Sequence, residues 1–239
     1  MYAEQNSGDW LDLFSGGVPT APFFFDYTLN GLEKVYLNQS ENTSSHINEL
    51  CVIGLVSYFE AFCKDHFASI INIEPSLLNN LSKNGQDISI EPTKALELGT
   101  ALFYNIGFLV AEKYDFGTAQ KINALYRALI MISPFSKDEI KIYDNLLRDR
   151  NLLVHHGGIY TSSYIAQNRN TLAPGLTRPF FNSLVVSKSY VEEKFNFIKE
   201  MARKILTASH TSLNQYLAEN AIQISEWKQK AVNSFLEEL

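Results

Sequence analysis

The longest apolar stretch, residues 44–72, constrains the fold of this chain most strongly. Apolar side chains occupy almost every helical position in it, and between Glu49 and Lys64 the only charged residue is Glu60. A helix that is apolar on nearly all sides is stable where other helices surround it. The stretch therefore predicts the central helix of an all-α bundle. With 46% hydrophobic residues among 239, the chain can build a substantial core around that helix.

The helical spacing of apolar residues predicts the remaining helices, near residues 93–113, 117–133, 190–218 and 221–238, with a short helix and a polar turn over 74–92. The apolar run 98–111 is shorter than the roughly twenty residues of a membrane span, so we expect it in the core. The last helix packs either on the bundle or on a second subunit. We divide the chain into an N-terminal extension packed on the bundle, residues 1–40, and a helical domain, residues 41–239. Phe23 to Phe25 anchor the extension or form a partner-binding patch.

A further helix has clear sequence signals at both ends. Ser136 and Glu139 have the spacing of a capping box, in which each side chain binds a backbone N–H of the first turn. Gly157 and Gly158 can supply the left-handed residue that ends a helix. These signals predict a helix of about five turns from residue 137 to residue 156.

Arg150 lies on the apolar side of this predicted helix. A helical wheel places it near the centre of an arc formed by Ile142, Tyr143, Leu146, Leu147, Leu153 and Val154. A buried and unpaired guanidinium would cost several kcal/mol, so Arg150 requires an anionic partner. We predict that this partner is Glu60; the alternative is that Glu60 lies on a narrow solvent-exposed face.

The opposite arc of the same helix carries Asp144, Arg148, Asn151 and His155. These side chains project together, and a histidine, an amide and a guanidinium so placed can bind a phosphate. The order Arg150, Asn151, three residues and His155 resembles the signature of HEPN domains. In that signature an arginine is followed by a polar residue and, four to six positions after the arginine, by a histidine near a helix end. The run from Ser57 to Asp65 also resembles the long second helix of such domains.

After the motif helix, the helical pattern breaks over residues 157–186, which predicts a long irregular or small hairpin insertion. The resemblance implies an all-α, HEPN-like bundle. It implies a metal-independent endoribonuclease that acts on RNA as a homodimer, with one cleft composed of two copies of the motif. It also suggests a toxin–antitoxin or antiphage-defence effector, with an antitoxin or defence-system protein as a partner. Arg150, His155 and Asn151 would be the catalytic residues, supported by Arg148, Asp144, His156 and Glu60.

The residue types fit RNA cleavage by attack of the 2′-hydroxyl on its own phosphorus, which leaves 2′,3′-cyclic phosphate and 5′-hydroxyl ends. Histidine can act as base or acid, and arginine can stabilise charge on phosphate oxygens. Each chain carries one such set, so we expect one His155 of a dimer to act as acid and its mate as base. The wheel separates Arg150 from His155 by about 140°. Either the last turn is distorted, or Arg150 orients the site from below while Arg148 contacts phosphate.

Two other functions are conceivable for the same residues, a metal site and a non-catalytic module. A metal site built on Asp144, His155 and His156 is not expected, because adjacent histidines on a helix point about 100° apart and Arg148 would repel a cation. No cofactor is expected either. A non-catalytic RNA-binding or protein-assembly module is the alternative to the enzyme. The net charge of −6 favours the module, whereas Arg148, Asn151 and His155 on one arc favour the enzyme.

The N-terminal sequence and the two cysteines indicate where the protein is located. We find no secretory signal, and Cys51 and Cys63 would lie roughly 18 Å apart on one helix, too far for a disulfide. We therefore predict a cytoplasmic protein without membrane association.

The insertion could hold single-stranded RNA by charge and stacking, or it could be an ordinary packed loop. Its candidate RNA-binding side chains are Tyr160, Tyr164, Arg169, Arg178, Phe180 and Phe181.

Overall fold

The computed structural model describes residues 23–38, 44–169, 172 and 178–237, and these residues are mostly helical. The elements in chain order are η2 (Phe23–Leu29), α1 (Asn30–Leu37), α2 (Ser44–Ile73), η4 (Pro75–Leu77), α3 (Leu78–Lys83), α4 (Pro92–Leu98), η5 (Gly99–Ala101), α5 (Leu102–Ala111), α6 (Ala119–Ile130), α7 (Lys137–His156), α8 (Ser162–Gln167), α9 (Lys188–Glu219), α10 (Glu226–Asn233) and η6 (Ser234–Leu236). No helix in the described ranges is long and apolar enough to cross a membrane.

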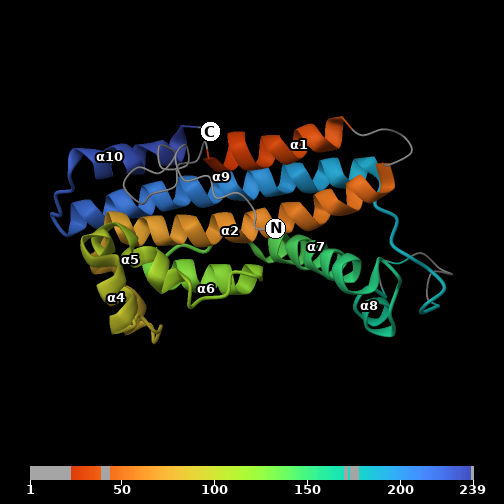
Figure 1. The fold of residues 1–239 in the computed structure, drawn as a ribbon, viewed down its shortest axis with the longest axis horizontal. Coiled ribbons are helices and arrows are strands. Elements are labelled where there is room, and N and C mark those ends of the chain that lie inside the picture. The colour runs from red at the N-terminus through yellow and green to blue at the C-terminus, as the bar shows by residue number, and fades with distance from the viewer. Residues whose placement is uncertain (1–22, 39–43, 170–171, 173–177, 238–239) are drawn as a thin grey trace.

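The helices form an elongated bundle around α2 and α9, which run side by side along its long axis (Figure 1). α1 and α10 cover one side of this pair, and α5, α6 and α7 cover the other, while α4 and α8 lie at opposite ends. Leu55, Phe59 and Phe67 of α2 are fully buried. The all-α class and the central position of the 44–72 helix are therefore confirmed.

The crossing of α2 and α5 depends on Gly107. The backbone N–H of Gly107 donates to Asn72 Oδ1 at 2.7 Å. A Cβ atom at position 107 would lie 2.8 Å from the carbonyl carbon of Ala68 and 2.8 Å from Asn72 Oδ1, closer than real Cβ contacts. Only glycine allows the two helix backbones to approach this closely.

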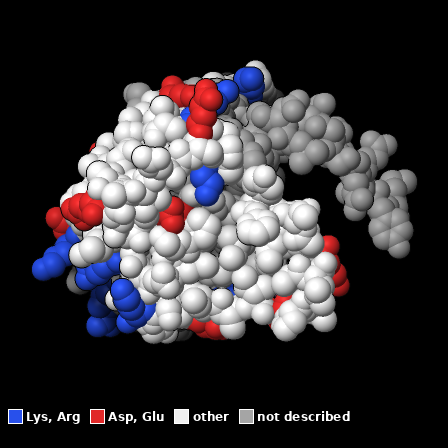
Figure 2. Space-filling view, turned by 90° about the vertical axis from the view of Figure 1, so that its left-hand side faces the viewer, with Lys and Arg blue, Asp and Glu red and all other residues white. Residues whose placement is uncertain are grey.

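The prediction of one core helix over residues 93–113 was wrong. The chain forms α4, η5 and α5 instead, because Gly99 ends α4 with a φ of 52°. Leu96 and Phe103 are 81% and 79% exposed, and α5 buries only Gly107, Val110 and Ala111. Figure 2 shows this end of the molecule, where uncharged residues cover most of the surface. The apolar run thus packs on the bundle along one face only.

Both ends of the described chain pack on the bundle. Phe24 and Phe25 are buried, and the Phe24 ring stacks on Phe62 with a centroid distance of 4.3 Å. Near the C-terminus, the ring of Phe235 meets His66 edge-on at 4.5 Å. The last helix therefore packs on its own bundle. Residues 1–22 and 39–40 of the predicted extension lie outside the described residues, so the division of the chain at residue 40 stays a prediction.

The two cysteines are buried free thiols on α2. Burial raises the pKa of the Cys51 thiol and, more strongly, that of Cys63. Raised pKa values keep both thiols protonated and weakly nucleophilic at neutral pH. Cys51 and Cys63 are therefore core residues in this fold.

Candidate active site at the end of helix α7

Helix α7 begins and ends as its sequence predicts. Ser136 N donates to Glu139 Oε2 at 2.6 Å, and Glu139 N donates to Ser136 Oγ at 3.4 Å, which completes the capping box. Gly157 adopts a left-handed conformation with a φ of 55° and closes the helix after His156. Because α7 is continuous through its last turn, a distortion of that turn does not bring Arg150 to His155.

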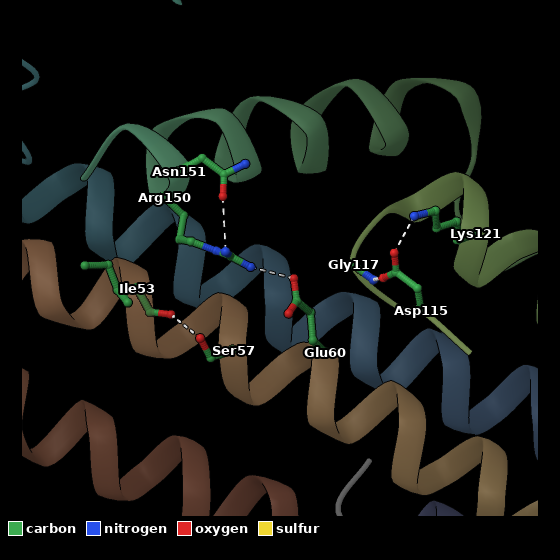
Figure 3. A network of polar contacts seen from close by, with 8 residues as sticks. All are labelled: Ile53, Ser57, Glu60, Asp115, Gly117, Lys121, Arg150 and Asn151. Atoms are coloured by element: carbon green, nitrogen blue, oxygen red, sulfur yellow. Dashed lines mark hydrogen bonds and ion pairs between the residues drawn. The ribbon is translucent and has the colours of Figure 1, made fainter. Parts of the chain in front are cut away.

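Arg150 connects α7 to α2. Its Nη2 donates to Glu60 Oε1 at 2.8 Å, and its Nη1 donates to Asn151 Oδ1 at 3.1 Å (Figure 3). The Arg150 and Glu60 side chains are 21% and 26% exposed. The predicted ion pair is thus present, and the alternative of a solvent-facing Glu60 was wrong. Arg150 lies beneath Asn151 and orients its amide.

The buried face of α7 differs from the predicted arc. Ile142 and Val154 are exposed, whereas Asp149 and Leu152 are buried. Leu152 packs with Tyr160 and Tyr164 of the insertion in a small cluster separate from the main core. The insertion therefore covers a flank of α7 that the wheel assigned to solvent, so the buried face extends further to one side of Arg150 than predicted.

Two charged groups near Glu60 shift its pKa in opposite directions. Burial raises the pKa of Glu60, the Arg150 guanidinium lowers it, and the nearby Asp115 raises it again. Asp115 is itself held by Lys121 and by the backbone N–H of Gly117, and the Lys121 contact is the main cause of its lowered pKa. In Figure 3, Asp115 and Lys121 lie on the side of Glu60 that faces away from Arg150.

A cavity of about 440 Å³ opens between α2, α7 and α8 and the segment that leads into α6. It is lined by Asp144, Leu147, Arg148, Arg150 and Asn151 of α7, with Glu60, Asp115, Gly117, Thr118 and Gln167. Three of the four polar residues on the predicted arc, Asp144, Arg148 and Asn151, thus line one cavity together with Arg150 and Glu60.

Neighbouring side chains hold Arg148 and Asp144 at this cavity. Arg148 Nε donates to Asn168 Oδ1 at 3.2 Å, and its Nη2 donates to Asn145 Oδ1. Asp144 Oδ2 accepts from Gln120 Nε2 at 3.1 Å. Because Asn168 directly follows α8, the insertion helps to position Arg148.

His155 and His156 lie outside the cavity. Both side chains are exposed in the last turn of α7, and neither forms a hydrogen bond or ion pair with the part of the chain that the structure describes. His155 follows Asn151 by four residues, so the two side chains share one helix face with Cβ atoms about 6 Å apart. Asn151 is therefore the residue that connects the cavity with His155.

Asp149 has a structural role that was not predicted from the sequence. Its carboxylate is buried and accepts from Tyr164 Oη at 2.6 Å and from Tyr190 Oη at 2.5 Å. These bonds join α7, α8 and α9. Burial first, and then Asp149, raise the pKa of both tyrosines. The sequence position of Asp149 could have indicated this burial. Asp149 follows Leu146 by three residues and precedes Leu153 by four, and both leucines are buried on the same side of the helix.

The insertion is more ordered than an irregular loop. It contains α8 and an isolated antiparallel bridge between Ile159 and Ser183. Tyr160 and Tyr164 are buried and stack at 5.0 Å, so they are not available to bases. The exposed candidates for RNA binding are Arg169, Arg178, Phe180 and Phe181. Residues 170–171 and 173–177 lie outside the described residues.

Comparison of the chain with known protein families, with curated proteins and with solved structures found no match in any of the three. Across the described ranges, no group of three or more His, Cys, Asp or Glu side chains is placed to hold a metal ion. The functional inference therefore rests on the side chains of α7 and on the cavity beside them.

Proposed function

We propose that the chain is a metal-independent endoribonuclease of the HEPN type, which acts as a homodimer. One observation carries the proposal. Arg150 donates hydrogen bonds to both Glu60 and Asn151. The bond to Asn151 uses the Oδ1 atom of its amide, so the Nδ2 donor of Asn151 is left on the exposed helix face that it shares with His155. A fixed amide donor beside an exposed imidazole suits the binding and cleavage of a phosphodiester.

The reaction requires two proton transfers. The RNA 2′-oxygen forms a bond to phosphorus while the bond from phosphorus to the 5′-oxygen breaks. His155 of one subunit accepts the 2′-hydroxyl proton, and His155 of the partner subunit donates a proton to the departing 5′-oxygen. Asn151 Nδ2 donates to a non-bridging oxygen as charge accumulates there. Arg150 acts as a positioning residue because its Nη1 and Nη2 donate to Asn151 and Glu60 and its Nε is buried away from the surface.

Dimerisation is supported by the surface around His155. Val154 and Ile159, on either side of it in sequence, are each 47% exposed. Apolar side chains beside a polar site suit a twofold contact that brings the two copies of His155 together. Such an enzyme would arrest a cell by cutting its RNA, so the proposal extends to a toxin or antiphage-defence effector that a partner protein controls.

The test compares the wild type with His155→Ala on mixed RNA in excess EDTA, followed by identification of the fragment ends. His46→Ala is the matched control, since His46 is an exposed histidine on α2 with an 85% exposed side chain. Wild type and control should leave 2′,3′-cyclic phosphate and 5′-hydroxyl ends, and His155→Ala should cleave at least about 100-fold more slowly. Equal rates for wild type and His155→Ala, or loss of wild-type cleavage in EDTA, would refute the proposal.

A second candidate is a non-catalytic RNA-binding or protein-assembly module. The observation that favours it is the neutralisation of Arg150 by Glu60 in a cavity that also contains the carboxylates of Asp115 and Asp144. In this case Arg150 and Asn151 would maintain an interface. Folded, dimeric wild-type protein that binds RNA without cutting it would support the module.

A further inference from the structure

The cavity beside Arg150 carries charges of both signs. Two guanidinium groups, Arg148 and Arg150, line it together with the carboxylates of Glu60, Asp115 and Asp144. A phosphate group offers only acceptors, so three carboxylates at short range would repel it. A neutral ligand with both donors and acceptors matches this lining better.

The atoms left for a ligand can be identified from the existing bonds. Both Asp115 oxygens are engaged, by Gly117 N and by Lys121. Glu60 Oε1 binds Arg150 and Asp144 Oδ2 binds Gln120, but Glu60 Oε2 and Asp144 Oδ1 have no partner among the residues that the structure describes. Arg148 Nη1 is likewise without a partner there. The charged side chains of the cavity therefore offer a ligand two carboxylate acceptors and one guanidinium donor, and Asn151 adds its Nδ2 donor.

We propose that this cavity binds the guanine base of an RNA nucleotide next to the cleaved bond. Guanine is the RNA base that presents two adjacent donors, N1–H and the N2 amino group, to a carboxylate. Its O6 and N7 are acceptors that match an arginine. Adenine would place its N1 acceptor against a carboxylate. Single-stranded RNA exposes these edges for such contacts.

The position of the cavity fits the proposed reaction, and the inference rests on the proposed function in taking the ligand to be RNA. A volume of about 440 Å³ is within the usual range of small-ligand pockets. Asn151 lines the cavity and shares a helix face with His155, so a base bound there would have its sugar and phosphate directed along Asn151. Gln167 of α8 also lines the cavity, which gives the insertion a direct role in base selection.

The test measures binding of guanosine 5′-monophosphate and of the other three ribonucleoside monophosphates by titration calorimetry. All four probes carry the same phosphate, so differences report on the base. We expect guanosine monophosphate to bind the wild type at least about tenfold more tightly than the others, and Glu60→Gln and Asp144→Asn each to weaken it at least about tenfold. Asp138→Asn, which removes an exposed carboxylate of α7 outside the cavity, should bind as the wild type does.

Equal binding of the four nucleotides, no binding of any of them, or wild-type binding by Asp144→Asn would overturn the inference. Asp144 is only partly buried, so this variant is informative even if Glu60→Gln does not fold. Because binding requires no cleavage, the two proposals fail separately. Guanine-selective binding without RNA cleavage would refute the ribonuclease alone, and cleavage without guanine-selective binding would refute the base site alone.

Discussion

Arg150 Nη2 and Glu60 Oε1 lie 2.8 Å apart across the interface of α7 and α2. Glu60 is the only charge between Glu49 and Lys64 on the central helix, and Arg150 is the arginine of the motif. Since the same guanidinium also holds Asn151, the ion pair ties the candidate site to the middle of the core. The orientation of Asn151 thus depends on a residue ninety positions earlier in the chain than Arg150.

The first prediction concerns the energy of this pair. Glu60→Ala leaves the Arg150 guanidinium partly buried and unpaired, so we expect it to lower the free energy of unfolding by about 1–3 kcal/mol. A double-mutant cycle with Arg150→Ala, measured by urea denaturation, should give a coupling of about 1 kcal/mol or more. Additive effects of the two single changes would show that the pair contributes nothing to stability.

The second prediction concerns acid stability, on which two adjacent residues act in opposite directions. Complete burial lowers the pKa of His66 to about 3, so its contribution to stability is present above about pH 6.5 and is lost as the pH falls toward 3. Burial raises the pKa of Asp65 to about 6, so its contribution is full below about pH 3.8 and is lost as the pH rises toward 6.

Between about pH 4 and pH 6 these two contributions offset each other in the wild type, each with a slope of about 1.4 kcal/mol per pH unit. Asp65→Asn should therefore make the protein more sensitive to acid over this range, and His66→Leu should make it less so. Thermal or urea unfolding at several pH values measures the slopes. Parallel pH profiles for both variants and the wild type would refute the assignment.

The third prediction tests the contact of α2 with α5. Gly107→Ala forces a Cβ against Ala68 and Asn72, so we expect a loss of about 3 kcal/mol in the free energy of unfolding. Gly31→Ala is the control, because Gly31 is also helical but a Cβ at its position would have no other atom within 4 Å. The control should be neutral or slightly stabilising. Equal effects of the two substitutions would contradict the close approach.

The fourth prediction concerns the hydrogen bonds that hold the insertion on α7. Tyr164→Phe and Tyr190→Phe each remove one donor from the buried Asp149 carboxylate and should cost about 1–2 kcal/mol. Hydrogen exchange should show faster opening of α8 in both variants. Tyr58→Phe, at an exposed position of α2, is the control and should leave stability and exchange unchanged. Unaltered protection of α8 in Tyr164→Phe would contradict the role of this bond.

Local chemistry made part of this structure predictable from sequence. The bounds of α7 follow from Ser136, Glu139 and Gly157, which act within one turn of the helix end. The ion pair of Glu60 and Arg150 was predictable for another reason. A single carboxylate on an apolar helix and a single guanidinium on an apolar arc each require a partner of opposite charge.

Tertiary packing determined what the sequence did not reveal. The donors to Asp149 lie 15 and 41 residues away, and no local pattern pairs them. Phe103 belongs to an apolar run whose composition predicts burial, yet its side chain is exposed. Hydrophobicity alone does not determine which face of such a run the bundle covers. In contrast, the separation of His155 from Arg150 followed from helical geometry and holds in the structure, since α7 is regular.

The central claim is that two copies of His155 complete one metal-independent site, and mixed dimers test it most directly. Wild type and His155→Ala are refolded together in varied ratios, and initial rates of RNA cleavage are measured in excess EDTA. If both histidines are required, the rate falls as the square of the wild-type fraction, to about one quarter in an equal mixture. A linear fall to about one half, or cleavage that does not depend on His155, would contradict the composite site.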